Sequence, residues 1–187
     1  MRNRIVDIGA YQPVDTECYL LDANVWISLC CPMGNHEKQK SATYSSFLKA
    51  AINNKAKIVI CSMVLSEVIN TWFRIEFNIL RQKDPRIYSD YKRDFRGRDI
   101  YKAVAEEIKT GISGQILKFA SPIDDGFTQA NLKAMLSGIA ETDFNDICHA
   151  ELSSREKLVF VTNDRDFAFI GADIKILTAN IKMLRRT

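Results

Sequence analysis

The feature that most constrains the fold is the alternation of short apolar runs with longer helical stretches. Four runs of four or five residues are rich in β-branched and aromatic side chains, and residues with helical spacing separate them. The runs cover residues 18–21, 57–61, 158–162 and 174–177. Strands that alternate with helices form βαβ units, in which the strands are parallel. The sequence therefore predicts a three-layer α/β domain built on a parallel sheet.

The remaining segments complete this prediction. A length of 187 residues favours a single domain. Residues 1–17 have weak periodicity and are predicted to be an N-terminal extension, and residues 122–126 are predicted to form a turn. The predicted helices cover residues 24–29, 36–53, 63–81, 99–119, 127–136, 143–156 and 167–170.

Composition excludes several classes of protein. The sequence has no apolar run of 18 residues, and its charged start lacks the apolar region of a signal peptide. We therefore expect a cytoplasmic protein. The five cysteines are odd in number and form no Cys-x-x-Cys pair, which predicts free thiols rather than disulfides or a zinc site.

Two acidic residues follow predicted strands. Asp22 ends the first strand, and Asp164 lies just past residues 158–162. Ligands of open α/β sheets bind beyond the carboxyl ends of the strands. Both carboxylates are therefore expected at the edge of the sheet where a site would form.

Two further acids lie within predicted helices and away from cap positions. Glu67 stands at the rim of an apolar helix face, and Asp146 is followed by Ile147, Cys148 and Ala150. A carboxylate in such a setting is costly unless it is paired or binds a metal. Two bare carboxylates 4 Å apart repel by about 4 kcal/mol at an effective dielectric constant of 20, and a hard cation relieves this repulsion. The acids together predict a site for Mg²⁺ or Mn²⁺.

Some of these acids have a purely structural alternative. Asp22 and Asp166 could be helix N-caps, Asp164 could close an Asx turn, and Asp143 could cap the helix that carries Asp146. Glu67 and Asp146 have no such alternative.

Four spaced motifs resemble those of the PIN-domain nucleases. Residues 20–27 read Leu-Leu-Asp-Ala-Asn-Val-Trp-Ile, and residues 62–67 read Ser-Met-Val-Leu-Ser-Glu. Residues 143–150 read Asp-Phe-Asn-Asp-Ile-Cys-His-Ala, and residues 161–167 read Val-Thr-Asn-Asp-Arg-Asp-Phe. The motifs occur in the family's order and span residues 18 to 178, which is most of the chain.

The resemblance implies a specific fold and chemistry. It implies a PIN-like domain over residues 18–187, with a parallel five-stranded sheet in the order 3-2-1-4-5. Within this domain, the sequence itself predicts a basic helical insert at about residues 81–120. The resemblance also implies cleavage of RNA phosphodiester bonds with Mg²⁺ or Mn²⁺, and many small bacterial members are VapC-type toxins with an antitoxin partner. The implied catalytic and metal-binding acids are Asp22, Glu67, Asp146 and Asp164, with Asp143 and Asp166 as metal-binding neighbours and Asn24, Ser62 and Thr162 in support.

The sequence departs from the family pattern in two places. The chain is longer than a minimal toxin between Glu67 and Asp146, and His149 replaces a common aliphatic residue. A lone histidine on an apolar helix face is typically a core residue with a hydrogen-bond partner, although His149 could also assist proton transfer. The main alternative function is a non-catalytic PIN-like module that binds RNA or protein.

The positive charge of the chain is concentrated in residues 81–102. This segment has eight basic and four acidic residues, a net charge of +4, whereas the whole chain has a net charge of +3. Aromatic residues lie between the charges, so the segment could bind phosphates and stack on bases, with Arg93, Arg96 and Arg98 as the RNA-binding residues. The alternative is a solvated helical hairpin whose acids pair with its bases.

A homodimer is also expected, from the resemblance and from the apolar residues of the helices predicted at 63–81 and 99–119. The candidate contact residues are Ile75, Phe77, Ile79, Leu80, Ile100 and Val104.

Overall fold

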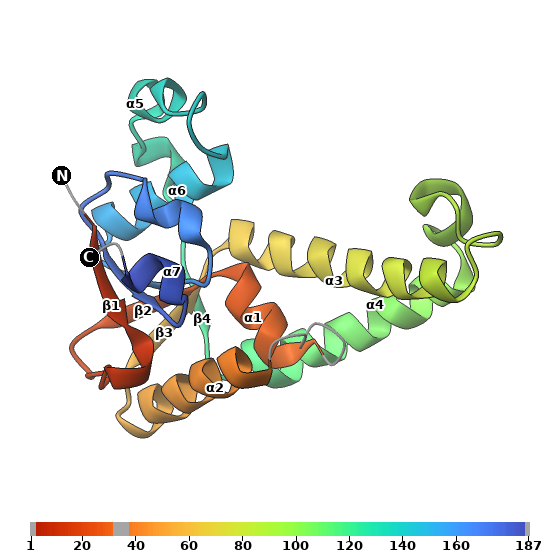
Figure 1. Ribbon diagram of the computed structural model, residues 1–187, viewed down its shortest axis with the longest axis horizontal. Coiled ribbons are helices and arrows are strands. Elements are labelled where there is room, and N and C mark those ends of the chain that lie inside the picture. Colours follow the sequence, from red (N-terminus) through yellow and green to blue (C-terminus); the bar gives the residue numbers. More distant parts are fainter. Residues whose placement is uncertain (1–2, 32–37, 186–187) are drawn as a thin grey trace.

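The computed structural model describes residues 3–31 and 38–185 and has a six-stranded parallel sheet with helices on both sides (Figure 1). The sheet order is β1-β6-β5-β2-β3-β4. Without β1, the strands follow the order 3-2-1-4-5 in chain numbering, as the resemblance implied. The strands are β1 (Arg4–Asp7), β2 (Cys18–Leu21), β3 (Lys57–Ile60), β4 (Ser121–Pro122), β5 (Val159–Val161) and β6 (Lys175–Thr178).

The sheet has six strands rather than five because the predicted extension supplies β1. Residues 4–7 pair in parallel with β6, from Arg4 opposite Lys175 to Asp7 opposite Thr178. The edge strand β4 was also not predicted. Its two residues are exposed, and it pairs only with the end of β3.

Six of the seven predicted helices are observed, although several differ in length. The helix predicted over residues 167–170 is instead the short 3-10 helix η5 (Arg165–Ala168), and the last α-helix of the chain was not predicted. The α-helices are α1 (Ala23–Cys30), α2 (Lys38–Asn53), α3 (Ser62–Lys83), α4 (Asp99–Gly111), α5 (Leu132–Ser137), α6 (Phe144–Arg155) and α7 (Ile181–Leu184). The start predicted for α2 at residue 36 lies outside the described residues. The helix predicted over residues 99–119 ends at Gly111 and continues as a π-helical turn, η3 (Ile112–Ile116).

The central strands are buried on both faces, as is typical of a parallel sheet between helices. Tyr19, Leu20 and Leu21 of β2 have no exposed surface, and Phe160 of β5 has none. Trp26 of α1 is equally buried and packs in the same core. Asp22 and Asp164 follow β2 and β5, so the strands that position these two acids are anchored in this core.

The cysteines of the chain are all free thiols. Within residues 3–31 and 38–185, no helix is both long and apolar enough to cross a membrane.

Helices α3 and α4, with residues 84–98 between them, form a long arm that projects from the sheet (Figure 1). The two helices approach closely at Gly111, where a Cβ atom would lie 2.5 Å from the Trp72 ring. Glycine is therefore required at this position for the helices to keep their spacing. The far end of the arm lies within residues 81–120, for which a basic helical insert stays a prediction.

An aromatic cluster closes the far end of the arm. Its members are Phe73, Phe77, Tyr91, Phe95 and Tyr101. Phe95 lies in the π-helical turn η2 (Tyr91–Phe95), is completely buried and contacts each of the other four rings. Phe73 and Tyr101 stack at a centroid distance of 4.3 Å. Because Phe95 is buried among these rings, it is not available for the stacking on bases expected from the sequence.

Several of the apolar residues that were expected to form a homodimer contact are packed within the arm instead. Phe77 and Val104 are buried inside the arm, and Ile75 and Leu80 are partly buried against it. Ile100 remains 37% exposed. The apolar residues of α3 and α4 are therefore explained mostly by the contact between these two helices.

Candidate active site

The predicted acids converge at the carboxyl edge of the sheet. Asp22 directly follows β2, and Asp164 follows β5 after two residues. Because β2 and β5 are neighbouring parallel strands, both acids lie at the same edge. Helices α3 and α6 bring Glu67 and Asp146 to this edge from outside the sheet.

Asp22 is buried, with 6% of its surface exposed, and is held by side chains of two other motif residues. Thr162 Oγ1 donates to Asp22 Oδ2 at 2.6 Å, and Asn24 Nδ2 donates to the same oxygen at 2.5 Å. Although Asp22 stands at the N-cap position of α1, its side chain makes no capping hydrogen bond. The carboxylate is thus not used as a helix cap, and it is contacted by Asn24 and Thr162, the residues proposed to support the site.

The pKa of Asp22 is raised. Burial is the largest cause, and the charge of Glu67 adds to it, while the hydrogen bond from Thr162 and the nearby His149 act in the opposite direction. A further positive charge nearby would therefore stabilise the ionised carboxylate of Asp22.

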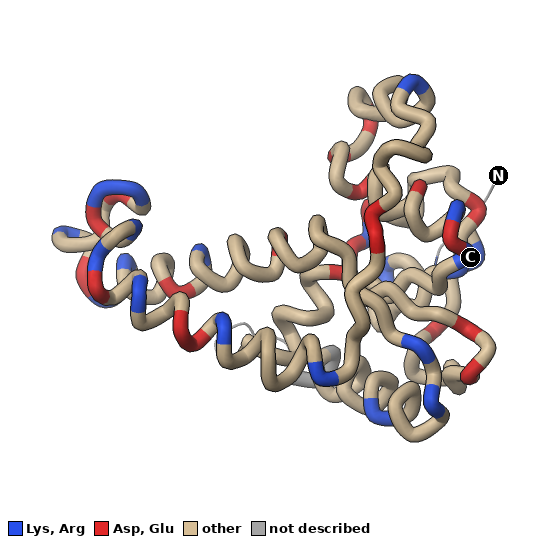
Figure 2. Tube along the Cα trace, turned by 180° about the vertical axis from the view of Figure 1, so that it is seen from behind, with Lys and Arg blue, Asp and Glu red and all other residues tan. Residues whose placement is uncertain are grey.

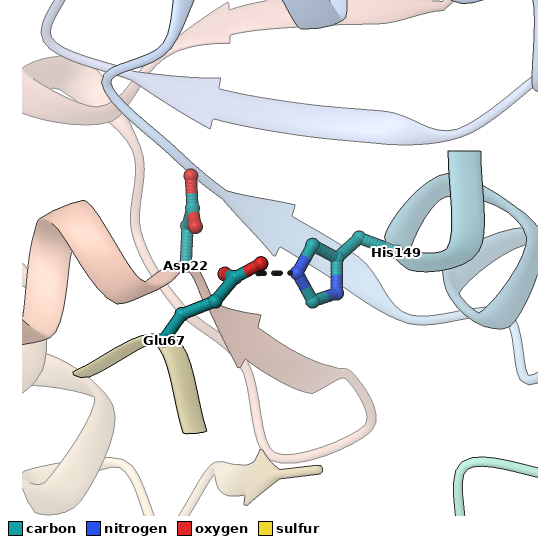
Figure 3. A group of neighbouring side chains, drawn as sticks. All are labelled: Asp22, Glu67 and His149. Carbon is teal, nitrogen blue, oxygen red and sulfur yellow. Dashed lines mark hydrogen bonds and ion pairs between the residues drawn. The ribbon is translucent and has the colours of Figure 1, made fainter. Parts of the chain in front are cut away.

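Glu67 joins α3 to α6 and takes part in the group drawn in Figure 3. Its Oε1 accepts a hydrogen bond from Asn145 Nδ2 at 2.7 Å, and its Oε2 lies 3.2 Å from His149 Nε2. One atom each of Asp22, Glu67 and His149 lies within 4.8 Å of the others. Asn145 and His149 flank Asp146 on the same helix, so Glu67 fixes the segment that carries this acid.

His149 is a buried histidine beside the acidic cluster, which consists of Asp22, Glu67, Asp146 and Asp164. Only 2% of its surface is exposed, and its ring lies beside Phe160 at a centroid distance of 6.0 Å. Burial by itself disfavours the charged imidazolium. Hydrogen bonds with Cys61 and Glu67 and the charges of Glu67 and Asp22 outweigh it and raise the pKa of His149 to about 10. The raised pKa of His149 favours its cationic form beside Glu67.

Asp146 is the acid with the least support from neighbouring groups. Among the described residues, none forms a hydrogen bond or ion pair with its carboxylate. Burial and the charges of Asp164, Asp22 and Asp143 raise the pKa of Asp146 to about 7, although His149 works in the other direction. A half-buried, unpaired carboxylate among three others is a setting that a hard cation would stabilise.

Several other predicted residues have structural contacts. Asp143 caps α6 by accepting a hydrogen bond from Asn145 N at 2.9 Å. Asp164 accepts one from Asp166 N at 2.9 Å, and its own N–H donates to Thr162. The exposed Asp166 lies 3.6 Å from Arg165. In Asp143, Asp164 and Asp166, each of these contacts uses only one of the two carboxylate oxygens.

Ser62 does not contact the acidic cluster. Its N–H donates to Asp125 Oδ1 at 3.0 Å, and its hydroxyl donates to Asp125 Oδ2. The cap position of α3 is Cys61 rather than Ser62, and Asp125 satisfies the first turn of the helix from a distant loop. Ser62 thus orients α3, on which Glu67 lies one and a half turns later.

The oxygen-rich donor set suits Mg²⁺ or Mn²⁺, which prefer carboxylate oxygens. Asp22, Asp146 and Asp164 come from three elements and face one edge, while His149 supplies a single positive charge among them. Sequence reasoning identified these acids and left open a role for His149 in proton transfer, but it did not place Asn145 or Cys61 with them. The spacing of His149 three residues after Asp146, on one helix face, was the available signal.

The sequence profile of the PIN domain matches residues 19–172. The chain belongs to the PIN-domain family. The match covers the strand that precedes Asp22 and extends beyond Asp164, so it contains the whole acidic cluster. Membership of the PIN family, together with this cluster, supports a nuclease role.

A solved structure with a TM-score above 0.5 shares this fold. The chain is similar to VapBC2 from Rickettsia felis, which was crystallised bound to a DNA fragment from its promoter, with a TM-score of 0.52 and 17% identity over 86% of this chain and 98% of that chain. PAE2754 from Pyrobaculum aerophilum has a TM-score of 0.48 and 18% identity over 90% of this chain and 96% of that chain. No curated protein matches the sequence significantly.

Proposed function

We propose that the protein is an endoribonuclease that depends on Mg²⁺ or Mn²⁺. The observation that carries the proposal is the Asp146 carboxylate, which is half buried, unpaired among the described residues and close to Asp22 and Asp164. A cation held there would neutralise charge that develops on a phosphodiester and would help to activate water. Asp22, Asp146 and Asp164 are proposed to hold the ion, with Glu67, Asp143 and Asp166 beside them.

The chain's own residues would prepare this site before the ion binds. Thr162 and Asn24 fix the carboxylate of Asp22 by hydrogen bonds to one oxygen, which leaves its Oδ1 for the ion. His149 offsets one negative charge and orients Glu67. Holding the acids in a fixed geometry avoids the cost of reorganising them during the reaction.

The proposal is tested by adding and removing the metal. Purified protein is expected to cleave single-stranded RNA with Mn²⁺ or Mg²⁺ and to lose this activity in excess EDTA. The same ions are expected to raise the melting temperature, because a ligand that binds only the folded state stabilises it, by about 2.7 kcal/mol at 100 times its Kd. If neither ion raises the melting temperature and no RNA is cleaved, the non-catalytic binding module is the better description.

A VapC-type toxin role with an antitoxin partner is a narrower form of this proposal. It is supported by the PIN fold and by the similarity to VapBC2. A homodimer and a cytoplasmic location remain proposals as well.

The tip of the arm is proposed to hold RNA through Arg93, Arg96 and Arg98. Figure 2 shows that basic and acidic residues are interleaved along this part of the chain. Arg93 pairs with Asp94 at 2.7 Å, which agrees with the solvated-hairpin alternative. Arg96 and Arg98 form no ion pair with any residue that the structure describes. The proposal therefore depends most on these two arginines.

Replacing all three arginines by Gln is expected to weaken RNA binding and to lower the slope of log K against log salt by about 2 to 2.7, at 0.7–0.9 per phosphate contact. Fluorescence anisotropy over a series of salt concentrations measures both quantities. A matched control replaces three exposed lysines outside the arm, Lys49, Lys118 and Lys133, by Gln. Equal slopes for the two triple variants would support the solvated hairpin and leave the metal site unaffected.

A further inference from the structure

A cavity of about 320 Å³ is lined in part by the short helix that begins directly after Asp164. The described residues that line it are Arg165, Asp166, Ala168, Phe169, Lys182 and Met183. They come from α7 and from the short helix η5 (Arg165–Ala168) and its C-cap. The fully buried Met183 anchors α7, and the Asn180 side chain donates to Asn163 O at 2.7 Å, so the two walls are tied together.

The position of the cavity relates it to the cleavage site. Strands β6, β5 and β2 are neighbours in the sheet and run parallel, so their carboxyl ends follow one another along one edge. The acidic cluster lies beyond β2 and β5, and the cavity lies beyond β5 and β6. Adjacent strands are about 4.8 Å apart. A strand of nucleic acid placed on the cluster would therefore reach the cavity within a short distance.

The charge of the cavity suits a phosphate. Arg165 and Lys182 are both exposed, and Lys182 has no ion pair within the described part of the chain. Arg165 lies 3.6 Å from Asp166, but the two side chains are 67% and 59% exposed, and such pairs contribute little. A guanidinium has five N–H donors, so one exposed contact leaves most of them available. Asp166 offsets one of the two positive charges, so the charged residues of the lining carry a net charge of +1.

An aromatic ring completes the lining. Phe169 lines the cavity, and 64% of its surface is exposed. Aromatic side chains next to cationic groups are typical platforms for unpaired bases. The cavity thus combines two cations with one ring, which matches the phosphate and base of a single nucleotide.

We propose that this cavity is a subsite for the nucleotide next to the cleaved bond. Arg165 and Lys182 bind the phosphodiester of that nucleotide, and Phe169 stacks on its base. The inference rests on the proposed ribonuclease function, because the neighbouring nucleotide must belong to the same single-stranded RNA that the acidic cluster cleaves.

The experiment compares the full-length protein with the double variant Arg165→Gln/Lys182→Gln. Binding of a fluorescent single-stranded RNA decamer is measured by anisotropy without metal, over a series of salt concentrations. The double variant is expected to bind about tenfold more weakly, with a salt slope lower by about 1.4, at 0.7 for each phosphate contact on a single strand. The control Arg4→Gln/Lys57→Gln loses the same charges from exposed residues that begin β1 and β3, at the opposite edge of the sheet. It is expected to keep the wild-type slope.

Two further variants separate charge from stacking. The exchange Arg165→Lys/Lys182→Arg keeps both charges and is expected to retain the wild-type salt slope. Phe169→Ala is expected to weaken binding about tenfold with an unchanged slope, because stacking releases no counterions.

RNA cleavage by the wild-type protein with Mn²⁺ distinguishes the failure of this inference from that of the proposed function. If the wild type cleaves RNA but the double variant and its control bind alike, the subsite is wrong and the ribonuclease proposal stands. If the wild type neither binds nor cleaves RNA, both are wrong.

Discussion

Replacing Asp146 by Asn is expected to slow RNA cleavage at least about a thousandfold, because the loss of a metal-binding carboxylate removes several kcal/mol of charge stabilisation from the transition state. The same substitution is expected to stabilise the metal-free protein at pH 8. At that pH the carboxylate is ionised, and it lies among the charges of Asp164, Asp22 and Asp143. Removing this repulsion is expected to raise the melting temperature by about 2–4 °C for each kcal/mol gained.

Single-turnover cleavage and thermal unfolding with and without Mn²⁺ measure both effects. The metal-dependent rise in melting temperature is expected to disappear in the variant. Asp173→Asn is a suitable control, because Asp173 is exposed and has a φ of 56°, which Asn tolerates. Cleavage by Asp146→Asn at the wild-type rate would exclude Asp146 from the catalytic residues.

Replacing Phe95 by Ala is expected to destabilise the arm by about 3–5 kcal/mol, the usual cost of removing a buried phenyl ring. Phe95 is fully buried and contacts four other rings of the aromatic cluster. Urea unfolding and limited proteolysis of residues 84–98 measure the effect, with faster cleavage of this segment in the variant.

Phe127→Ala is the matched control, because it deletes the same ring from a position that is 52% exposed. Its free energy of unfolding is expected to change by less than about 1 kcal/mol. If Phe95→Ala and Phe127→Ala unfolded at the same urea concentration, the ring of Phe95 would not support the tip.

The central strands could be predicted from the sequence because burial on both faces leaves a continuous apolar run. The strands at the two edges leave no such pattern. In β1 the end residues are exposed and the middle two only partly buried, and β4 consists of the exposed residues Ser121 and Pro122. These strands exist because they pair with β6 and β3. The partner strands lie far away in the sequence, so a periodic pattern within a short segment does not reveal the pairing.

The same distinction between local and distant contacts applies to the candidate site. Asp22 and Asp164 were predictable because each follows an apolar strand. The contacts of Glu67 with Asn145 and His149 join residues 78 and 82 positions apart, and neither residue type identifies its partner. At the arm tip, the sequence pattern of aromatic residues between arginines is compatible both with stacking on bases and with packing of the rings on one another. Only the placement of Phe95 in a π-helical turn decides between them.

The pairing of β1 with β6 has a consequence for folding during synthesis. Arg4 and Lys175 lie opposite each other although 171 positions separate them in the chain. At 5–20 residues per second, a ribosome needs roughly 10–30 s to make the intervening segment. The central strands can associate in this interval, but the backbone groups of β1 have no partner strand until β6 emerges. The outer edge of the sheet therefore closes last, and until then β1 depends on water or on a chaperone for its hydrogen bonds.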